Sequence, residues 1–211
     1  PVVAAKTATV CSLDAFSVTP VDGVTSDIVP VGTTYDWSAP AAVSGITGLA
    51  SGTNEANFNG TLTNTTNTAI QVTYVVTPSN GTCAGSPFNV VVTVDPTPSV
   101  VAQAASVCSG SAFSVAPANG SGNIVPTGTT YDWSAPAAIT GISGLTAGVT
   151  QTTIGGTLSN STSAPIDVVY SVTPTNGSCV GTAFNVTVTV NPTPVVAAKT
   201  ATVCSLDAFS V

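Results

Sequence analysis

The sequence predicts an all-β chain of tandem sandwich domains, and three observations support this fold class. Thr, Ser, Val, Ala, Gly and Asn dominate the composition, which favours strands and glycine turns over helices. The segment GTTYDWSAPAA occurs at residues 32–42 and again at 128–138, so the chain contains two homologous modules. Residues 194–211 repeat residues 1–18 letter for letter, which indicates a periodic array. We expect module 1 at 1–97, module 2 at 98–193, and the first strands of a third module at 194–211.

Strand patterns follow one another at short intervals in each module. Residues 184–190 alternate Phe or Val with Asn or Thr, which predicts a strand with one buried face. Residues 167–173 precede it and are followed by a Pro-Thr-Asn-Gly turn, which predicts that the two segments form a closing hairpin. With roughly seven short strands per module, the economical fold is an immunoglobulin-like sandwich. We place the single tryptophan of each module, Trp37 and Trp133, in its core rather than on a sugar-stacking surface.

Each module ends in a proline-spaced joint, at residues 94–98 and 190–194. The prolines fix φ and restrict the residue before each of them, so the joints are short and stiff. Two modules on such joints should form a semi-rigid rod that advances about 80 Å along its axis. The one length difference between the modules falls in a loop between the first cysteine and the tryptophan, where insertions leave the core intact.

Composition excludes several functional classes. Charged residues make up 5% of the chain, the net charge is −7, and Lys6 and Lys199 are the only basic residues, so nucleic acid is not an expected partner. No apolar run approaches the ~20 residues of a membrane-spanning helix, so no membrane insertion is expected in this segment. Without histidine, we predict no catalytic triad, no zinc site and no neutral-pH proton shuttle. The chain is therefore not expected to be an enzyme or to bind a cofactor or metal.

The acidic residues and Lys6 could in principle serve a glycosidase pair, a calcium loop or an isopeptide bond. Asp132 and Asp167 could form a glycosidase-type pair, but Asp132 repeats Asp36 and is better explained as a solvated strand position. The first-module residues Asp22, Asp27 and Glu55 match no calcium loop, so polar loops explain them. An isopeptide bond from Lys6 finds no counterpart in module 2, which has no lysine, so we interpret Lys6 as a surface charge.

Two cysteines per module, without a CxxC motif, predict disulfides and an oxidising, extracellular compartment. One pairing lies within modules and joins Cys11 to Cys83 and Cys108 to Cys179, closing long loops. The other crosses the joint, because sandwich topology places the two cysteines of a module at opposite poles, beyond the reach of a disulfide. It joins Cys11 to Cys179 and leaves Cys83 and Cys108 for neighbouring modules. Both pairings remain open from the sequence.

Asparagines followed by x-Ser or x-Thr are candidate glycosylation sites, several of them in expected turns. They are Asn59, Asn64, Asn80, Asn119, Asn160, Asn176 and Asn185.

The repeated motifs resemble those of a known group. Cys-Ser-Gly-x-x-Phe-x-Val, Thr-Thr-Tyr-x-Trp, Val-x-Tyr-x-Val-Thr-Pro, Cys-x-Gly-x-x-Phe-x-Val and the closing Val-Thr-Val-Asn-Pro-x-Pro resemble the PKD-like, Ig-like tandem repeats of large secreted adhesins of Bacteroidetes. The resemblance covers essentially the whole chain. It implies extracellular or cell-surface placement, long arrays and an adhesive or scaffolding role, and no particular ligand. Module 1 departs from the motif at Cys11-Ser-Leu-Asp, which leaves the turn geometry there open.

Two functional hypotheses follow. In the first, the chain is a structural repeat of an extracellular filament or giant surface adhesin and acts as a stiff, disulfide-stabilised spacer. Its partners would be neighbouring modules and copies of the same protein, with glycans as a further option. In the second, it is a carbohydrate- or protein-binding module whose ligand site lies on the loops that differ between modules, residues 21–27 and 118–122.

Overall fold

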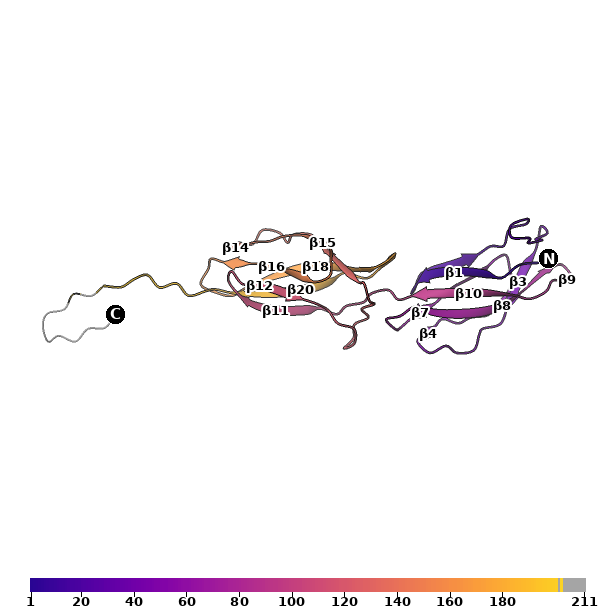
Figure 1. The fold of residues 1–211 in the computed structure, drawn as a ribbon, viewed down its shortest axis with the longest axis horizontal. Coiled ribbons are helices and arrows are strands. Elements are labelled where there is room, and N and C mark those ends of the chain that lie inside the picture. Colours follow the sequence, from indigo (N-terminus) through magenta and orange to yellow (C-terminus); the bar gives the residue numbers. More distant parts are fainter. Residues whose placement is uncertain (201, 203–211) are drawn as a thin grey trace.

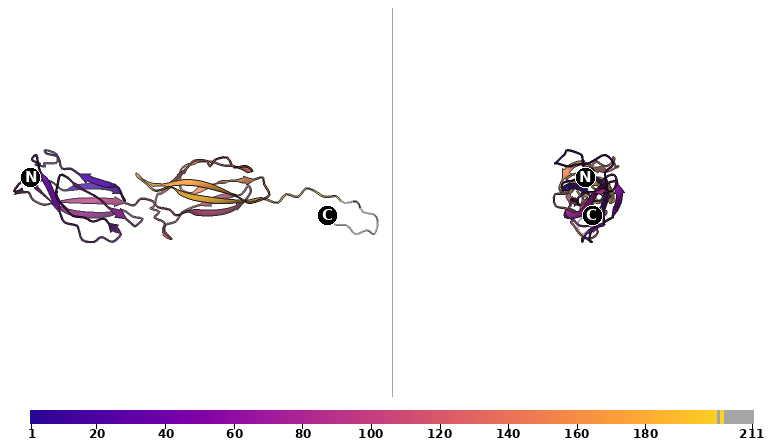
Figure 2. Two further views of the ribbon diagram at one scale, coloured as in Figure 1. Left: turned by 180° about the vertical axis from the view of Figure 1, so that it is seen from behind. Right: turned by 90° about the vertical axis from the view of Figure 1, so that its right-hand side faces the viewer.

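The computed structural model describes residues 1–200 and 202, and it shows two β-sandwiches that follow one another along a common axis (Figure 1). The view along that axis in Figure 2 shows the two modules one behind the other. Every regular element of the described residues is a strand, so the all-β prediction is confirmed. Residues 192–200 form no strand, and residues 201 and 203–211 of the expected third module, Cys204 included, lie outside the described residues.

Module 1 is a sandwich of one large sheet and two short strand pairs. In the large sheet β1 runs parallel to its neighbour β10, whereas the other pairings are antiparallel. Its strands, in spatial order, are β1 (Lys6–Cys11), β10 (Phe88–Asp95), β8 (Ile70–Asn80), β3 (Thr34–Trp37) and β5 (Gly52–Glu55), with β9 (Cys83–Ala84) paired to β8. The short pairs are β2 (Ala15–Val18) with β6 (Phe58–Thr61) and β4 (Ile46–Thr47) with β7 (Thr63–Asn64).

Module 2 repeats this topology strand for strand. Its large sheet contains β11 (Gln103–Cys108), β20 (Phe184–Asn191), β18 (Ile166–Asn176), β13 (Thr130–Trp133) and β15 (Gly148–Gln151), with β19 (Cys179–Val180) on β18. The short pairs are β12 (Ala112–Val115) with β16 (Ile154–Thr157) and β14 (Ile142–Ser143) with β17 (Ser159–Asn160). The strands number more than the seven expected because β4, β7 and β9 are two residues long and show no alternation that a sequence pattern could reveal.

The predicted closing hairpin supplies the centre of each core. Strand β20 alternates as expected, and Val186, Val188 and Val190 have no exposed surface. The two tryptophans are buried, with 8% of Trp37 and 7% of Trp133 exposed, so their predicted place in the core is confirmed and neither ring forms a sugar-stacking surface. Each indole lies directly against a glycine, Gly52 or Gly148, where a Cβ would collide with the ring. The indole Nε1 of Trp37 donates to the carbonyl of Ala50 at 3.1 Å.

The two poles of a module are set by the direction of its strands. We call the end of β1 and β10, where Cys11 lies opposite Asp95, the lower pole. The other end, where β8 turns into β9 and Asn80 lies opposite Cys83, is the upper pole. Ile70 at the start of β8 lies opposite Val94, so β8 spans the module from pole to pole, about 33 Å at the usual strand rise.

Candidate functional site at the module junction

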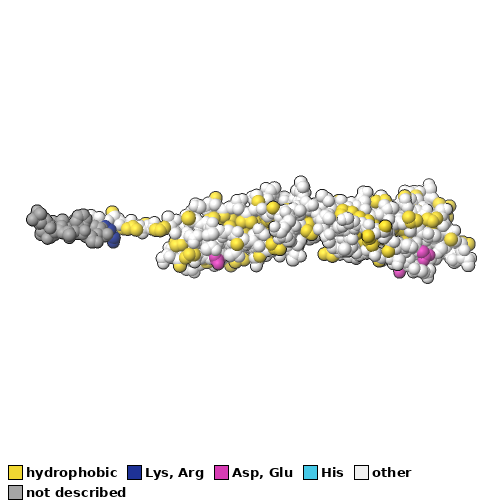
Figure 3. Space-filling view, turned by 90° about the horizontal axis from the view of Figure 1, so that it is seen from below, with side chains coloured by type: hydrophobic (Ala, Val, Ile, Leu, Met, Phe, Trp, Pro, Cys, Tyr) yellow, Lys and Arg dark blue, Asp and Glu magenta, His cyan; other side chains and the backbone are white. Residues whose placement is uncertain are grey.

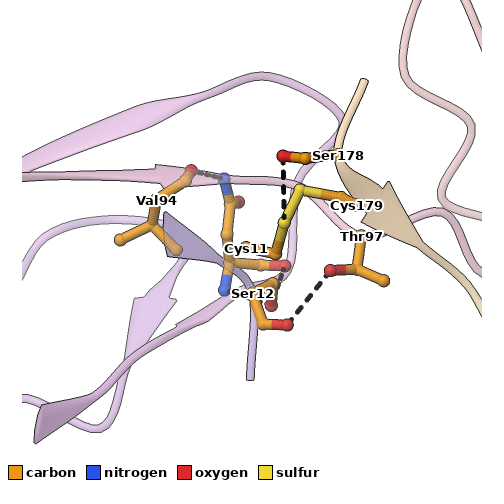
Figure 4. Close-up of a disulfide and its surroundings, with 7 residues drawn as sticks. Cys11, Ser12, Val94, Thr97, Ser178 and Cys179 are labelled. Carbon is orange, nitrogen blue, oxygen red and sulfur yellow. Dashed lines mark hydrogen bonds between the residues drawn. A yellow bond between two sulfur atoms is a disulfide. The ribbon is translucent and has the colours of Figure 1, made fainter. Parts of the chain in front are cut away.

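A disulfide joins the two modules. It connects Cys11, at the lower pole of module 1, to Cys179, at the upper pole of module 2, with 5.5 Å between the Cα atoms (Figure 4). The within-module pairing of Cys11 with Cys83, and of Cys108 with Cys179, is therefore wrong. Its physical obstacle is distance, because cysteines at opposite poles stand about 33 Å apart, whereas a disulfide needs Cα atoms within about 7 Å.

The proline joint is anchored to the turn that follows Cys11. The hydroxyl of Thr97 donates to the carbonyl oxygen of Ser12 at 3.0 Å (Figure 4). In module 2 Thr193 donates in the same way to Ser109. The threonine of the Pro-Thr-Pro sequence therefore fixes the direction in which the chain leaves the lower pole.

A glycine two residues after the cysteine brings the joint against the hairpin of the next module. Gly181 lies so close to the carbonyl oxygen of Pro98 that a Cβ could not be accommodated, and Gly85 has the same relation to Pro1. The glycine of Cys-x-Gly is therefore needed for the approach of the joint to the hairpin that carries Cys179. The sequence displayed this motif, but its role was missed because the contact is between distant segments.

A buried asparagine corner ties several backbone segments together at the lower pole. The Nδ2 group of Asn64 donates to the carbonyls of Val94 and Thr68, and its Oδ1 accepts from the N–H and hydroxyl of Thr66. Its backbone N–H donates to the hydroxyl of Ser12, which follows Cys11 directly. Asn160 makes the equivalent bonds in module 2, to Val190 among others. Because all polar atoms of the amide are paired, this corner can be buried at little cost.

The same corner removes two of the candidate glycosylation sites. Asn64 and Asn160 are 2% and 6% exposed, and the nitrogen that would carry the sugar donates two hydrogen bonds inside the fold. Three candidates lie on the surface, namely Asn59, Asn119 and Asn185. Asn80 and Asn176 are half-buried and donate to the carbonyls of Val31 and Thr127. Glycosylation of these five stays a prediction.

The remaining two cysteines lie at the outer ends of the pair of modules, in the positions equivalent to those of the bonded cysteines. Cys83 occupies in β9 the place that Cys179 occupies in β19, and Cys108 ends β11 as Cys11 ends β1. Both are exposed thiols without a disulfide partner among residues 1–200 and 202. Cys179 is only 2% exposed, because module 1 covers the upper pole of module 2. The disulfide state of Cys83 and Cys108 in a longer chain stays a prediction.

The turn after Cys11, which the sequence left open, has the same form as in module 2. Leu13 has a φ of 75° and its counterpart Gly110 a φ of 81°. Their backbone N–H groups donate to the carbonyls of Leu62 and Leu158 respectively. Leucine therefore adopts a left-handed conformation that glycine adopts freely, at a cost of about 1–2 kcal/mol.

Lys6 takes part in an ion pair, so its interpretation as a surface charge is wrong. Its Nζ lies 2.6 Å from Oδ2 of Asp27, whose side chain is fully buried. Burial acts to raise the pKa of Asp27, but the bonds from Lys6 and from the backbone N–H of Ala4 outweigh it, and the pKa is lowered. In module 2 the neutral Asn123 accepts the equivalent bond from Val101 at 2.9 Å.

Several of the carboxylates accept structural hydrogen bonds. Asp22 and Asp27 accept backbone N–H groups, and within the described part of the chain no three His, Cys, Asp or Glu side chains gather as a metal site would require. Asp132 accepts the N–H of Thr150, a residue with positive φ in an irregular strand pairing. Asp167 lies six positions from the partner of Asp132 along β18, about 20 Å away, which is too far for a glycosidase pair. Acidic side chains are sparse on the face in Figure 3.

Comparison with known proteins gives a family match over most of the chain. The model of the PKD-like domain matches residues 8–98 and again residues 105–194. A search of curated proteins found no match. None of the described segments is a helix of the length and apolar character that crossing a membrane requires.

The similar solved structures are distant. They include the titin I-band fragment I67–I69, with 8% identity, a TM-score of 0.35, and coverage of 90% of this chain and 63% of that one. Mouse clustered PcdhgC3 EC1-3 has 14% identity and a TM-score of 0.35, with coverage of 88% of this chain and 64% of that one. An endo-fucoidan hydrolase of glycoside hydrolase family 107 is also similar, with 16% identity, a TM-score of 0.32, and coverage of 92% of this chain and 28% of that one. The chain thus spans less than two thirds of each of these proteins, and likenesses this weak carry no information on function.

Proposed function

Since the chain belongs to the PKD-like domain family, as two tandem copies, we propose that it is a structural repeat of an extracellular filament or giant surface adhesin. It acts there as a stiff spacer whose junctions are closed by disulfides. The Cys11–Cys179 bond across the joint carries this proposal, because it fixes distance and direction between modules rather than stabilising one module. A disulfide also requires an oxidising compartment, which supports an extracellular or cell-surface location.

The repeat extends the same bond to the neighbouring junctions. A lower pole with Cys108 is built like the lower pole with Cys11, and an upper pole with Cys83 is built like the upper pole with Cys179. When the sequence continues for another period, Cys108 meets the next copy of Cys83. Every module is then joined to both neighbours through the backbone and through sulfur. A large secreted adhesin, of the Bacteroidetes kind that the motifs resemble, is the finer form of this proposal.

Non-reducing peptide mapping of a chain that continues for a second period tests the proposal. We expect two linked peptide pairs, Cys11 with Cys179 and Cys83 with Cys108. When Cys83 of the first period is replaced by serine, the second pair should persist, because the copy in the next period supplies the thiol. Recovery of Cys11 linked to Cys83, or of Cys11 and Cys179 as free thiols in secreted material, would contradict the proposal. Electron microscopy of the same material should show extended rods.

The binding alternative has one observation in its favour. A shallow groove lies on the outer face beside β3 and recurs at the same place in module 2, lined by Asp36, Ala39 and Val75 and by Asp132, Ala135 and Val169 respectively. The exposed valines, 58% for Val75 and 47% for Val169, offer apolar contact to a ligand. Screening the chain against a carbohydrate array tests this function. Binding that Val75→Asp and Val169→Asp both weaken would support it, and absence of binding would leave the spacer as the function.

A further inference from the structure

The disulfide opens a covalent route that bypasses both cores. From Pro1, strand β1 leads to Cys11 at the lower pole of module 1, and the bond leads on to Cys179 at the upper pole of module 2. Strands β19 and β20 then lead to Asn191 at the lower pole of module 2. The cysteines are 168 residues apart in sequence, and everything between them is a loop closed by the bond.

The segments on this route are already nearly straight. Strand β1 is paired along its whole length with β10. On the other side of the bond, Cys179 lies opposite Asn176 and Phe184 opposite Val172, so β19 and β20 follow β18 with one extra residue between them. A strand rises about 3.3 Å per residue, and a fully extended chain reaches about 3.6 Å. Tension along this route can therefore lengthen the chain by only about 10%.

Without the bond, tension would load each module differently. It would enter module 1 at the start of β1 and leave at the end of β10, and these neighbours are parallel. The two strands would be pulled in opposite directions, and the pairs from Lys6–Val90 to Cys11–Asp95 would be sheared. Strands β11 and β20 have the same arrangement in module 2. Once these parallel strands separate, the rest of the module can unfold and lengthen.

We propose that the Cys11–Cys179 bond makes this pair of modules inextensible, and that its reduction releases a reserve of length of about 600 Å, at about 3.6 Å for each residue between the cysteines. A dithiol supplies the two electrons and two protons: the S–S bond breaks, two cysteine thiols form, and the dithiol becomes a disulfide. For this chain the inference rests on the Cys11–Cys179 bond. For a longer array it also rests on the proposed function, in which Cys108 and Cys83 close the alternate junctions.

Single-molecule pulling on the 211-residue chain, with peptide-tag handles at both termini, tests the inference. Over residues 1–191, the oxidised chain should lengthen by no more than about 10% before the handles fail. In dithiothreitol the same molecules should lengthen in steps that sum to about 600 Å. Lengthening beyond that limit of about 10%, in a sample that peptide mapping shows to contain the bond, would overturn the inference. So would a reduced chain that stays as short as the oxidised one.

Two double variants isolate the bond. Cys83→Ser with Cys108→Ser removes the two exposed thiols of the described residues and should behave as the oxidised parent does. The double variant Cys11→Ser with Cys179→Ser should lengthen both with and without dithiothreitol. If this variant does not fold, the reduced parent serves as the comparator. The outcomes separate the two proposals. Failure of Cys108 to link to the next Cys83 would refute the array alone, whereas long extension of the bonded chain would refute inextensibility alone.

Discussion

Gly181 packs against the carbonyl oxygen of Pro98 with no room for a Cβ, and this contact brings the upper pole of module 2 onto the joint. Gly181→Ala should push the hairpin of Cys179 away from Cys11. We expect the equilibrium constant for formation of the disulfide in a glutathione buffer to fall roughly tenfold, the equivalent of a steric penalty in the 1–3 kcal/mol range. Thiol quantification at fixed redox potential measures it.

The exposed neighbour Thr182 provides the control for that change, because Thr182→Ala removes atoms without adding any. The equilibrium constant of this variant should match that of the parent. An equal fall in both variants would mean that the hairpin is sensitive to any change of sequence and that Gly181 has no special role.

Loss of the asparagine corner should destabilise module 2. Asn160→Ala removes the hydrogen bonds to the carbonyls of Val190 and Ala164 and the bond from the N–H of Thr162, and we expect a loss of about 2–3 kcal/mol in the free energy of unfolding. Asn185→Ala changes an exposed asparagine and should cost less than about 0.5 kcal/mol. Urea denaturation of the oxidised chain measures both, and equal losses would argue against the corner.

The left-handed turn after Cys11 should prefer glycine. Leu13 is 67% exposed, so Leu13→Gly removes little apolar contact and relieves the strain of a φ of 75°. We expect a gain of about 1 kcal/mol in the stability of module 1. The reverse change, Gly110→Leu, should cost module 2 a similar amount. A loss of stability in Leu13→Gly would show that the leucine side chain makes a net favourable contact at the junction.

The ion pair of Lys6 and Asp27 should make module 1 sensitive to acid. The pKa of Asp27 is lower in the folded chain than its ordinary value of 3.8, so the pair stabilises the fold above that value. The stabilisation should be lost as the pH falls through the folded pKa. Urea midpoints between pH 7 and pH 2 measure the effect.

Module 2 provides the matched control for this titration. Gln103 and Asn123 stand where module 1 has Lys6 and Asp27, so Lys6→Gln with Asp27→Asn reproduces the neutral pair. This double variant should show a smaller acid loss than the parent. Identical acid profiles would assign the loss to other carboxylates.

The two modules and their core residues could be predicted from the sequence, because they depend on local alternation of apolar and polar residues. The valines of β20 and the buried tryptophans follow from patterns a few residues long. The disulfide pairing could not be decided in this way, since each cysteine precedes the same motif and only the pole-to-pole direction of the strands separates them. The burial of Asn64 likewise depends on Val94 and Ser12, which lie far from it in sequence.

The bond between Cys11 and Cys179 also bears on survival outside the cell. If a protease cuts the backbone once anywhere between these two residues, one fragment retains Cys11 and the other retains Cys179. The two fragments stay attached through sulfur, so a single nick in an exposed loop of either module does not sever the molecule.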